Sequence, residues 1–150
     1  MKKTILLCII AIACALTAFT ANKNLTLDEV FGKVSKIERF EVMDFPGGDM
    51  GFPDNLGKGT MAIHPNASPR DEIISLLSQL PPETLVYDNT DEKGRFDRIF
   101  VENGTSLMYV HVGLSTGDTV VILFKDGNKD NISDFVNKIN QGLKESNNSF

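Results

Sequence analysis

Tryptophan is absent from this chain of 150 residues, and cysteine is almost absent. The two cysteines, Cys8 and Cys14, both lie close to the N-terminus. The chain from residue 22 onward therefore has no thiol for a disulfide, a zinc–thiolate centre or a redox pair. A domain of this length has enough residues to bury a sizeable hydrophobic core without covalent crosslinks.

Clusters of basic residues and long hydrophobic runs are also missing. The chain has 15 basic and 20 acidic residues and a formal net charge of −5. An acidic chain without a basic patch is a poor candidate for binding nucleic acid or an anionic membrane surface. The apolar run over residues 5–16 is too short for a transmembrane helix. We therefore expect no nucleic-acid partner, and no transmembrane span in the mature chain.

The first 21 residues have the layout of a secretory signal peptide. Lys2 and Lys3 precede the apolar run, small residues follow it, and the chain turns polar at Asn22. This layout predicts cleavage between residues 18 and 21, with residues 22–150 forming a single mature domain. Removal of Lys2 and Lys3 leaves 13 basic against 20 acidic residues, and hence a net charge of −7. The predicted location is the periplasm or cell envelope.

Cys14 gives the leader a second interpretation. The tetrad Ala-Ile-Ala-Cys at residues 11–14 is similar to a bacterial lipobox, in which the cysteine is lipidated and becomes the new N-terminus. Against this interpretation, the first residue of the tetrad is Ala and not Leu, and the apolar run continues past Cys14 to Leu16. A lipoprotein anchored through Cys14 is therefore the alternative to cleavage between residues 18 and 21.

Residues 85–124 have the pattern of successive β-strands. The segments LVYDN, RFDRIFVE, SLMYVHV and TVVILF are separated by short polar stretches, which indicates an antiparallel meander. We expect positive φ at Gly94 and Gly117, where hairpin turns need it. The last two strands are apolar on both faces, and so should lie at the centre of the sheet with cover on both sides.

Three segments outside the meander have apolar residues at helical spacing. The first starts with a capping box formed by Thr26 and Glu29, the second ends before Pro81, and the third covers residues 132–144. Shorter strands are expected near Val42 and over residues 60–64. The predicted fold is α+β, with a single antiparallel sheet of about four or five strands packed by three helices.

The segment Asp44–Ala67 is one of two predicted binding regions, the other being an edge of the sheet. It is rich in glycine and proline and longer than an ordinary connection, and such loops are often functional or disordered. Met50 and Phe52 are apolar residues that we expect at an exposed loop tip, in contact with a partner. The decisive observation would be whether this loop is ordered and walls a pocket against the sheet.

The same segment carries three carboxylates, Asp44, Asp49 and Asp54, and the histidine His64. Carboxylates on a flexible loop are possible ligands of a hard cation, but the dense Asp-x-Asp pattern is missing, and solvated turn residues are the simpler interpretation. His64 is the histidine near these carboxylates, whereas His111 is expected to be a hydrogen-bonded residue of the sheet. No GxSxG or HExxH motif occurs, and we expect no bound metal and no cofactor.

The short leader, the strand SLMYVHV and the closing pattern TGDTVVILFKDG…DNISDFVNKIN together resemble small exported proteins of Bacteroidota that are classed as domains of unknown function. The resemblance covers most of the mature chain. It implies an envelope protein without known chemistry, and it carries over no site residue.

These patterns predict an exported, non-enzymatic binding module whose partner is an envelope protein or a small ligand. The alternative is a metal-dependent or hydrolytic enzyme that uses the Asp- and Gly-rich loop together with His64, and a purely structural role is a third possibility. The predicted binding residues are Met50, Phe52, Asp44, Asp49, Asp54 and His64.

Overall fold

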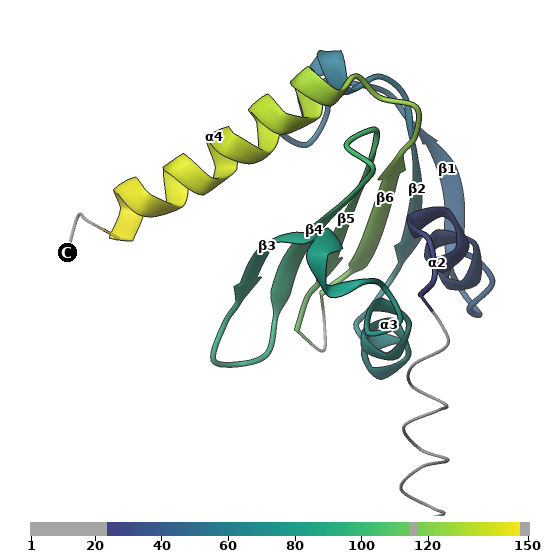
Figure 1. Cartoon of the computed structure of the whole chain (residues 1–150). Helices are drawn as coiled ribbons and strands as arrows, with labels where there is room; N and C mark the ends of the chain where they lie inside the picture. Colours follow the sequence, from purple (N-terminus) through teal and green to yellow (C-terminus); the bar gives the residue numbers. More distant parts are fainter. Residues whose placement is uncertain (1–23, 115–116, 148–150) are drawn as a thin grey trace, which may run out of the picture.

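The computed structural model describes residues 24–114 and 117–147. Its centre is an antiparallel sheet with the strand order β1–β2–β6–β5–β4–β3 (Figure 1). The strands are β1 (Glu41–Phe45), β2 (Gly59–His64), β3 (Leu85–Thr90), β4 (Phe96–Glu102), β5 (Ser106–Val112) and β6 (Thr119–Phe124). The helices are α2 (Leu27–Val34), α3 (Arg70–Leu77) and α4 (Lys129–Asn147), with 3₁₀ turns η1 (Asp54–Leu56) and η2 (Pro82–Thr84).

The α+β class and the three helices agree with the sequence pattern, but the expected four or five strands are wrong, because the sheet has six. Strands β1 and β2 flank the Gly-rich loop and form an antiparallel pair. This pair joins the meander because β2 also hydrogen-bonds to β6, with Ala62 opposite Val121. The predicted leader, its two cysteines and its cleavage region lie outside the described residues.

Strands β3 to β6 form the predicted meander, in which each strand pairs with the next. Gly94, between β3 and β4, has the expected positive φ of 87°. Gly117 follows residues 115–116, which lie outside the described residues, so its positive φ stays a prediction. The β4–β5 turn has positive φ at Asn103 and Gly104, at 53° and 69°, a conformation that Asn and Gly tolerate better than other residues.

Helices α2 and α3 cover one face of the sheet. The predicted capping box is present: the Thr26 hydroxyl accepts from the backbone N–H of Glu29 at 3.2 Å, and the Glu29 carboxylate accepts from that of Thr26 at 2.8 Å. The apolar residues of α2 are buried and pack with those of α3 on alternate residues of the central strands, among them Met108, Val110 and Val121. This face is a closed helix-on-sheet core.

The opposite face is covered by residues 46–58 and by the first part of α4, which then runs away from α2 and α3 (Figure 1). Phe52 lies in this second core, with 6% of its surface exposed. Its ring contacts the rings of Phe45, Phe124 and Phe135, with centroids 5.4–5.8 Å apart. The expectation of an exposed Phe52 is therefore wrong, because the loop folds back onto the sheet and uses this ring as its anchor.

None of the helices within residues 24–114 and 117–147 is long and apolar enough to cross a membrane.

Replacing Phe52 with Ala tests whether this ring anchors the loop. We expect Phe52→Ala to lower the free energy of unfolding by about 3–5 kcal/mol, because it leaves a cavity among the rings of Phe45, Phe124, Phe135 and Tyr109. Met50→Ala is the matched control in the same loop, since Met50 is 62% exposed and exposed substitutions usually change stability by less than about 0.5 kcal/mol. Chemical denaturation of both variants measures the difference, and equal stability would contradict the anchor role.

Candidate functional site

A groove of about 270 Å³ lies between the second face of the sheet, the 46–58 loop and α4. We call it the apolar groove, because aromatic and aliphatic side chains dominate its lining. These side chains are Met50, Phe52, Tyr87, Ile99, Tyr109, Phe135 and Ile139, and Gly51 and Asp97 complete the lining. Concave apolar surfaces with a few convergent polar groups are typical of small-molecule sites.

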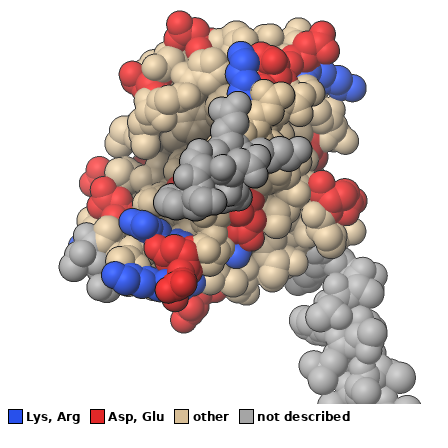
Figure 2. All heavy atoms as spheres, turned by 90° about the vertical axis from the view of Figure 1, so that its left-hand side faces the viewer, with Lys and Arg blue, Asp and Glu red and all other residues tan. Residues whose placement is uncertain are grey.

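A second hollow of about 150 Å³, which we call the polar hollow, shares Asp97 with the apolar groove. Its other lining residues are Asn89, Asp91, Arg95 and His111. Figure 2 shows the side of the molecule that carries β3 and the end of α4: uncharged side chains form most of this surface, and acidic and basic side chains adjoin one another at its lower left. The two hollows therefore offer apolar and polar surface side by side.

The register of the sheet brings the polar residues together. Asp97 of β4 lies opposite His111 of β5 and opposite Asn89 of β3. Residues that face one another across antiparallel strands project to the same side of the sheet. Two residues further along β4, Ile99 lies opposite Tyr87 of β3 and opposite Tyr109 of β5, and so forms the next cross-strand row on the same face. One row therefore supplies polar groups to the polar hollow, and the next supplies apolar and phenolic groups to the apolar groove.

Asp97 is the hub of the side-chain hydrogen bonds in this region. Its Oδ1 accepts the hydroxyl of Tyr109 at 2.6 Å and lies 2.7 Å from Nδ1 of His111. An ionised carboxylate only accepts hydrogen bonds, so Nδ1 carries the proton and Nε2 is the ring nitrogen left for another partner. Asp97 and His111 are each 30% exposed at the side chain, so solvent or a ligand can reach both.

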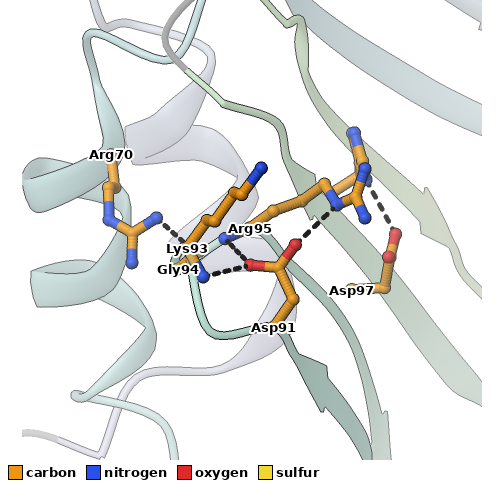
Figure 3. Close-up of polar contacts among 7 residues, drawn as sticks. Arg70, Asp91, Lys93, Gly94, Arg95 and Asp97 are labelled. Atoms are coloured by element: carbon orange, nitrogen blue, oxygen red, sulfur yellow. Dashed lines mark hydrogen bonds and ion pairs between the residues drawn. The ribbon is translucent and has the colours of Figure 1, made fainter.

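The hairpin between β3 and β4 holds Arg95 beside this hub (Figure 3). Oδ1 of Asp91 accepts the backbone N–H groups of Lys93 and Arg95 at 3.0 and 2.9 Å, which fixes the turn. Oδ2 of Asp91 lies 3.1 Å from Nε of Arg95. The carbonyl oxygen of Gly94 accepts a hydrogen bond from Arg70 of α3, which ties the hairpin to the other layer. The guanidinium of Arg95 is therefore positioned by its own turn.

The pKa of Tyr109 is raised above its ordinary value. Burial of the phenol is the main cause, because it disfavours the charged phenolate, and the hydrogen bond to Asp97 adds to it because it stabilises the protonated form. The negative charges of Asp97 and of a Tyr87 phenolate raise it further. Tyr109 therefore acts as a hydrogen-bond donor across the physiological pH range.

The structure places the predicted loop residues in three different environments. Met50 and Phe52 both line the apolar groove, Met50 at the surface and Phe52 in the core. Asp44 and Asp49 are exposed, on the edge strand β1 and in the loop respectively. Asp54 starts η1, and its carboxylate lies against Gly48. The three carboxylates do not line either hollow.

His64 lies away from these carboxylates, at the end of β2 opposite to the one that pairs with Asp44. Its side chain is buried, its Nδ1 is 3.0 Å from the carbonyl oxygen of Asn66, and its ring packs on Phe40. These contacts fix the turn after β2. Within the described ranges, no group of three or more His, Cys, Asp or Glu side chains is arranged to hold a metal ion.

Sequence reasoning missed Asp97, Arg95 and Tyr109 as site residues. Alternation along β5 correctly placed Tyr109 and His111 on one face, opposite Met108 and Val110. The alternation in β5 and the charged Asp97 in the adjacent strand β4 are visible in the sequence. They indicate a site only when the strand register is known, because the register places Asp97 beside Tyr109 and His111.

Comparisons with models of known protein families, with characterised proteins and with solved structures gave no significant match. The resemblance to exported Bacteroidota proteins therefore stays a prediction.

The raised pKa of Tyr109 is tested by titration in a Tyr87→Phe background, where Tyr109 is the remaining phenol. Tyr109 should keep its proton at pH about 10, where an ordinary tyrosine is half ionised. The unfolded chain loses this proton at about pH 10 while the folded chain keeps it. The raised pKa of Tyr109 therefore adds to the free energy of unfolding. This contribution is fully present below about pH 10, and it is lost as the pH rises through the pKa of Tyr109 in the folded chain.

Phenolate absorbance against pH provides the measurement, and denaturation at alkaline pH checks the linkage. Adding Asp97→Asn should lower the pKa of Tyr109, because the negative charge is removed. A phenol in the folded Tyr87→Phe protein that ionises at the ordinary value would contradict the assignment.

Proposed function

We propose that this protein is an exported, non-enzymatic binding module that takes a small ligand in the apolar groove and the adjoining polar hollow. The observation that carries the proposal is their shared lining residue, Asp97, which joins an apolar recess to a set of convergent polar groups. Such a combination gives a ligand both apolar burial and a fixed orientation. Export is inferred from the leader in the sequence.

The Gly-rich loop supports this proposal because it forms one wall of the groove. The loop is held by Phe52, and it presents Met50 at the rim with φ of 54° and 62% exposure. Positive φ is uncommon for a residue with an unbranched apolar side chain. An anchored loop with an exposed apolar rim residue fits ligand capture at the groove mouth.

Binding is favoured over catalysis by the surroundings of His111. A nucleophilic enzyme needs a hydroxyl or thiol within hydrogen-bond reach of its general base. Among the described residues the only side-chain partner of His111 is Asp97. The alternative enzyme would use His64 with Asp44, Asp49 or Asp54, and these residues lie in separate places.

Export is tested by expressing the full chain in a bacterial host and measuring the mass of the protein recovered from the cell envelope fraction. We expect a mature chain that begins between residues 19 and 22, because small residues mark the cleavage region. A lipid-modified chain that begins at Cys14 would favour the lipoprotein alternative. An uncleaved chain in the cytoplasmic fraction would contradict export.

Ligand capture at the groove is tested with 1-N-phenylnaphthylamine, a neutral apolar dye that fluoresces in apolar surroundings. We expect Met50→Asp to weaken dye binding about tenfold, since it replaces apolar contact at the rim with a charge. Val42→Asp is the matched control, because Val42 is 50% exposed but lies on the edge strand β1. Equal dye binding by both variants, or no dye binding by the parent protein, would contradict the proposal.

A further inference from the structure

We propose that the ligand is an amphipathic glycoside, with a neutral polyhydroxylated head in the polar hollow and an apolar tail in the apolar groove. This inference rests on the proposed function, and adds the chemical class of the ligand. It follows from the charge balance of the polar hollow, from its free hydrogen-bonding groups, and from its continuity with the apolar groove.

The polar hollow holds charged side chains of both signs, and each of its carboxylates already accepts hydrogen bonds within the protein. Arg95 is engaged by Asp91, with Nε and Oδ2 3.1 Å apart. Asp97 accepts hydrogen bonds from both Tyr109 and His111. An anionic ligand would meet one arginine beside two carboxylates, and a cationic ligand would meet the guanidinium of Arg95, which is 54% exposed in the same hollow. A head group without net charge is the one that this balance favours.

The polar hollow offers a ligand both hydrogen-bond donors and hydrogen-bond acceptors. Both bonds to Asp97 end on Oδ1, so Oδ2 accepts no hydrogen bond from the side chains of the described ranges. Nε2 of His111 makes no hydrogen bond with another residue of the described ranges. Asn89 is exposed with an amide that both donates and accepts, and Arg95 is 54% exposed with further N–H donors. A hydroxyl group donates one hydrogen bond and accepts two, so a set of neighbouring hydroxyls matches this mixture of planar donors and acceptors.

The apolar groove gives the tail its place. Tyr109 separates the two environments, because its ring lines the groove while its hydroxyl is bonded to Asp97. Beyond it, Phe135 and Ile139 of α4 face Ile99 of the sheet across the groove. A chain that leaves the head group at Asp97 therefore continues directly into apolar surroundings, where each buried methylene adds to affinity.

The test compares ligands that share a tail and differ in the head. The probes are octyl β-D-glucoside, octylamine and octyl phosphate, each kept below its micelle concentration, with methyl β-D-glucoside as the head alone. Amide chemical shifts of the full mature protein report both affinity and location. We expect octyl glucoside to bind tightest, about tenfold more tightly than methyl glucoside, with shifts in β3, β4, β5 and α4.

Variants of the polar hollow locate the head group. Asp97→Asn should weaken octyl glucoside about tenfold, because a charged acceptor of a ligand hydroxyl is replaced by a neutral amide. Asp88→Asn is the matched control on β3, since Asp88 pairs with Arg98 and lines neither hollow. Asn89→Ala, at an exposed position of the hollow, should weaken binding of octyl glucoside about threefold. This variant still tests the position of the head group if Asp97→Asn destabilises the fold.

Each outcome decides between the two proposals. Tighter binding of octylamine or octyl phosphate, or equal binding of all three octyl compounds, overturns the glycoside head but leaves a ligand-binding groove. Tightest binding of octyl glucoside without an effect of Asp97→Asn or Asn89→Ala overturns the placement of the head. No shift with any octyl compound overturns both the glycoside and the proposed function.

Discussion

Burial of β6 along its whole length is the constraint on which the rest of the structure depends. All six residues of Thr119–Phe124 are buried, and they alternate between the two faces of the sheet. A strand that is apolar on both faces requires cover on both. The chain meets this requirement with α2 and α3 on one face, and with a folded loop and the start of α4 on the other.

The two covers are unequal, and this inequality creates the candidate site. Two helices close the first face, whereas a Gly-rich loop and part of one helix cover the second. Over the second face the cover ends near Tyr109, and the next row of residues, with Asp97 and His111, stays partly exposed. The hydrogen bonds centred on Asp97 satisfy polar groups at the border of the core, where an unpaired group would be costly. The site is thus the uncovered margin of a hydrophobic core.

Local periodicity predicted much of the fold correctly. The capping box of Thr26 and Glu29, the meander, and the assignment of Met108 and Tyr109 to opposite faces all follow from neighbours close in sequence. Two expectations failed because they depend on distant partners. The sequence does not show that the β1–β2 pair joins the meander, since its attachment to β6 is a long-range contact. Phe52 was expected at the surface, since only packing against Phe45 and Phe124 reveals it as an anchor.

The sequence by itself determined the class of each element, the faces of the central strands, the acidic charge of the chain and the absence of cysteine from residue 22 onward, because composition and periodicity are local properties. Only the tertiary structure decided which polar residues meet. Glu102 pairs with Ser106 across the Asn103–Thr105 connection, and this register sets Asp97 opposite His111. A turn shorter by one residue would set Asp97 opposite Val110. A single-residue slip exchanges the faces of a strand, so the candidate site depends on a register that the packing of both layers selects.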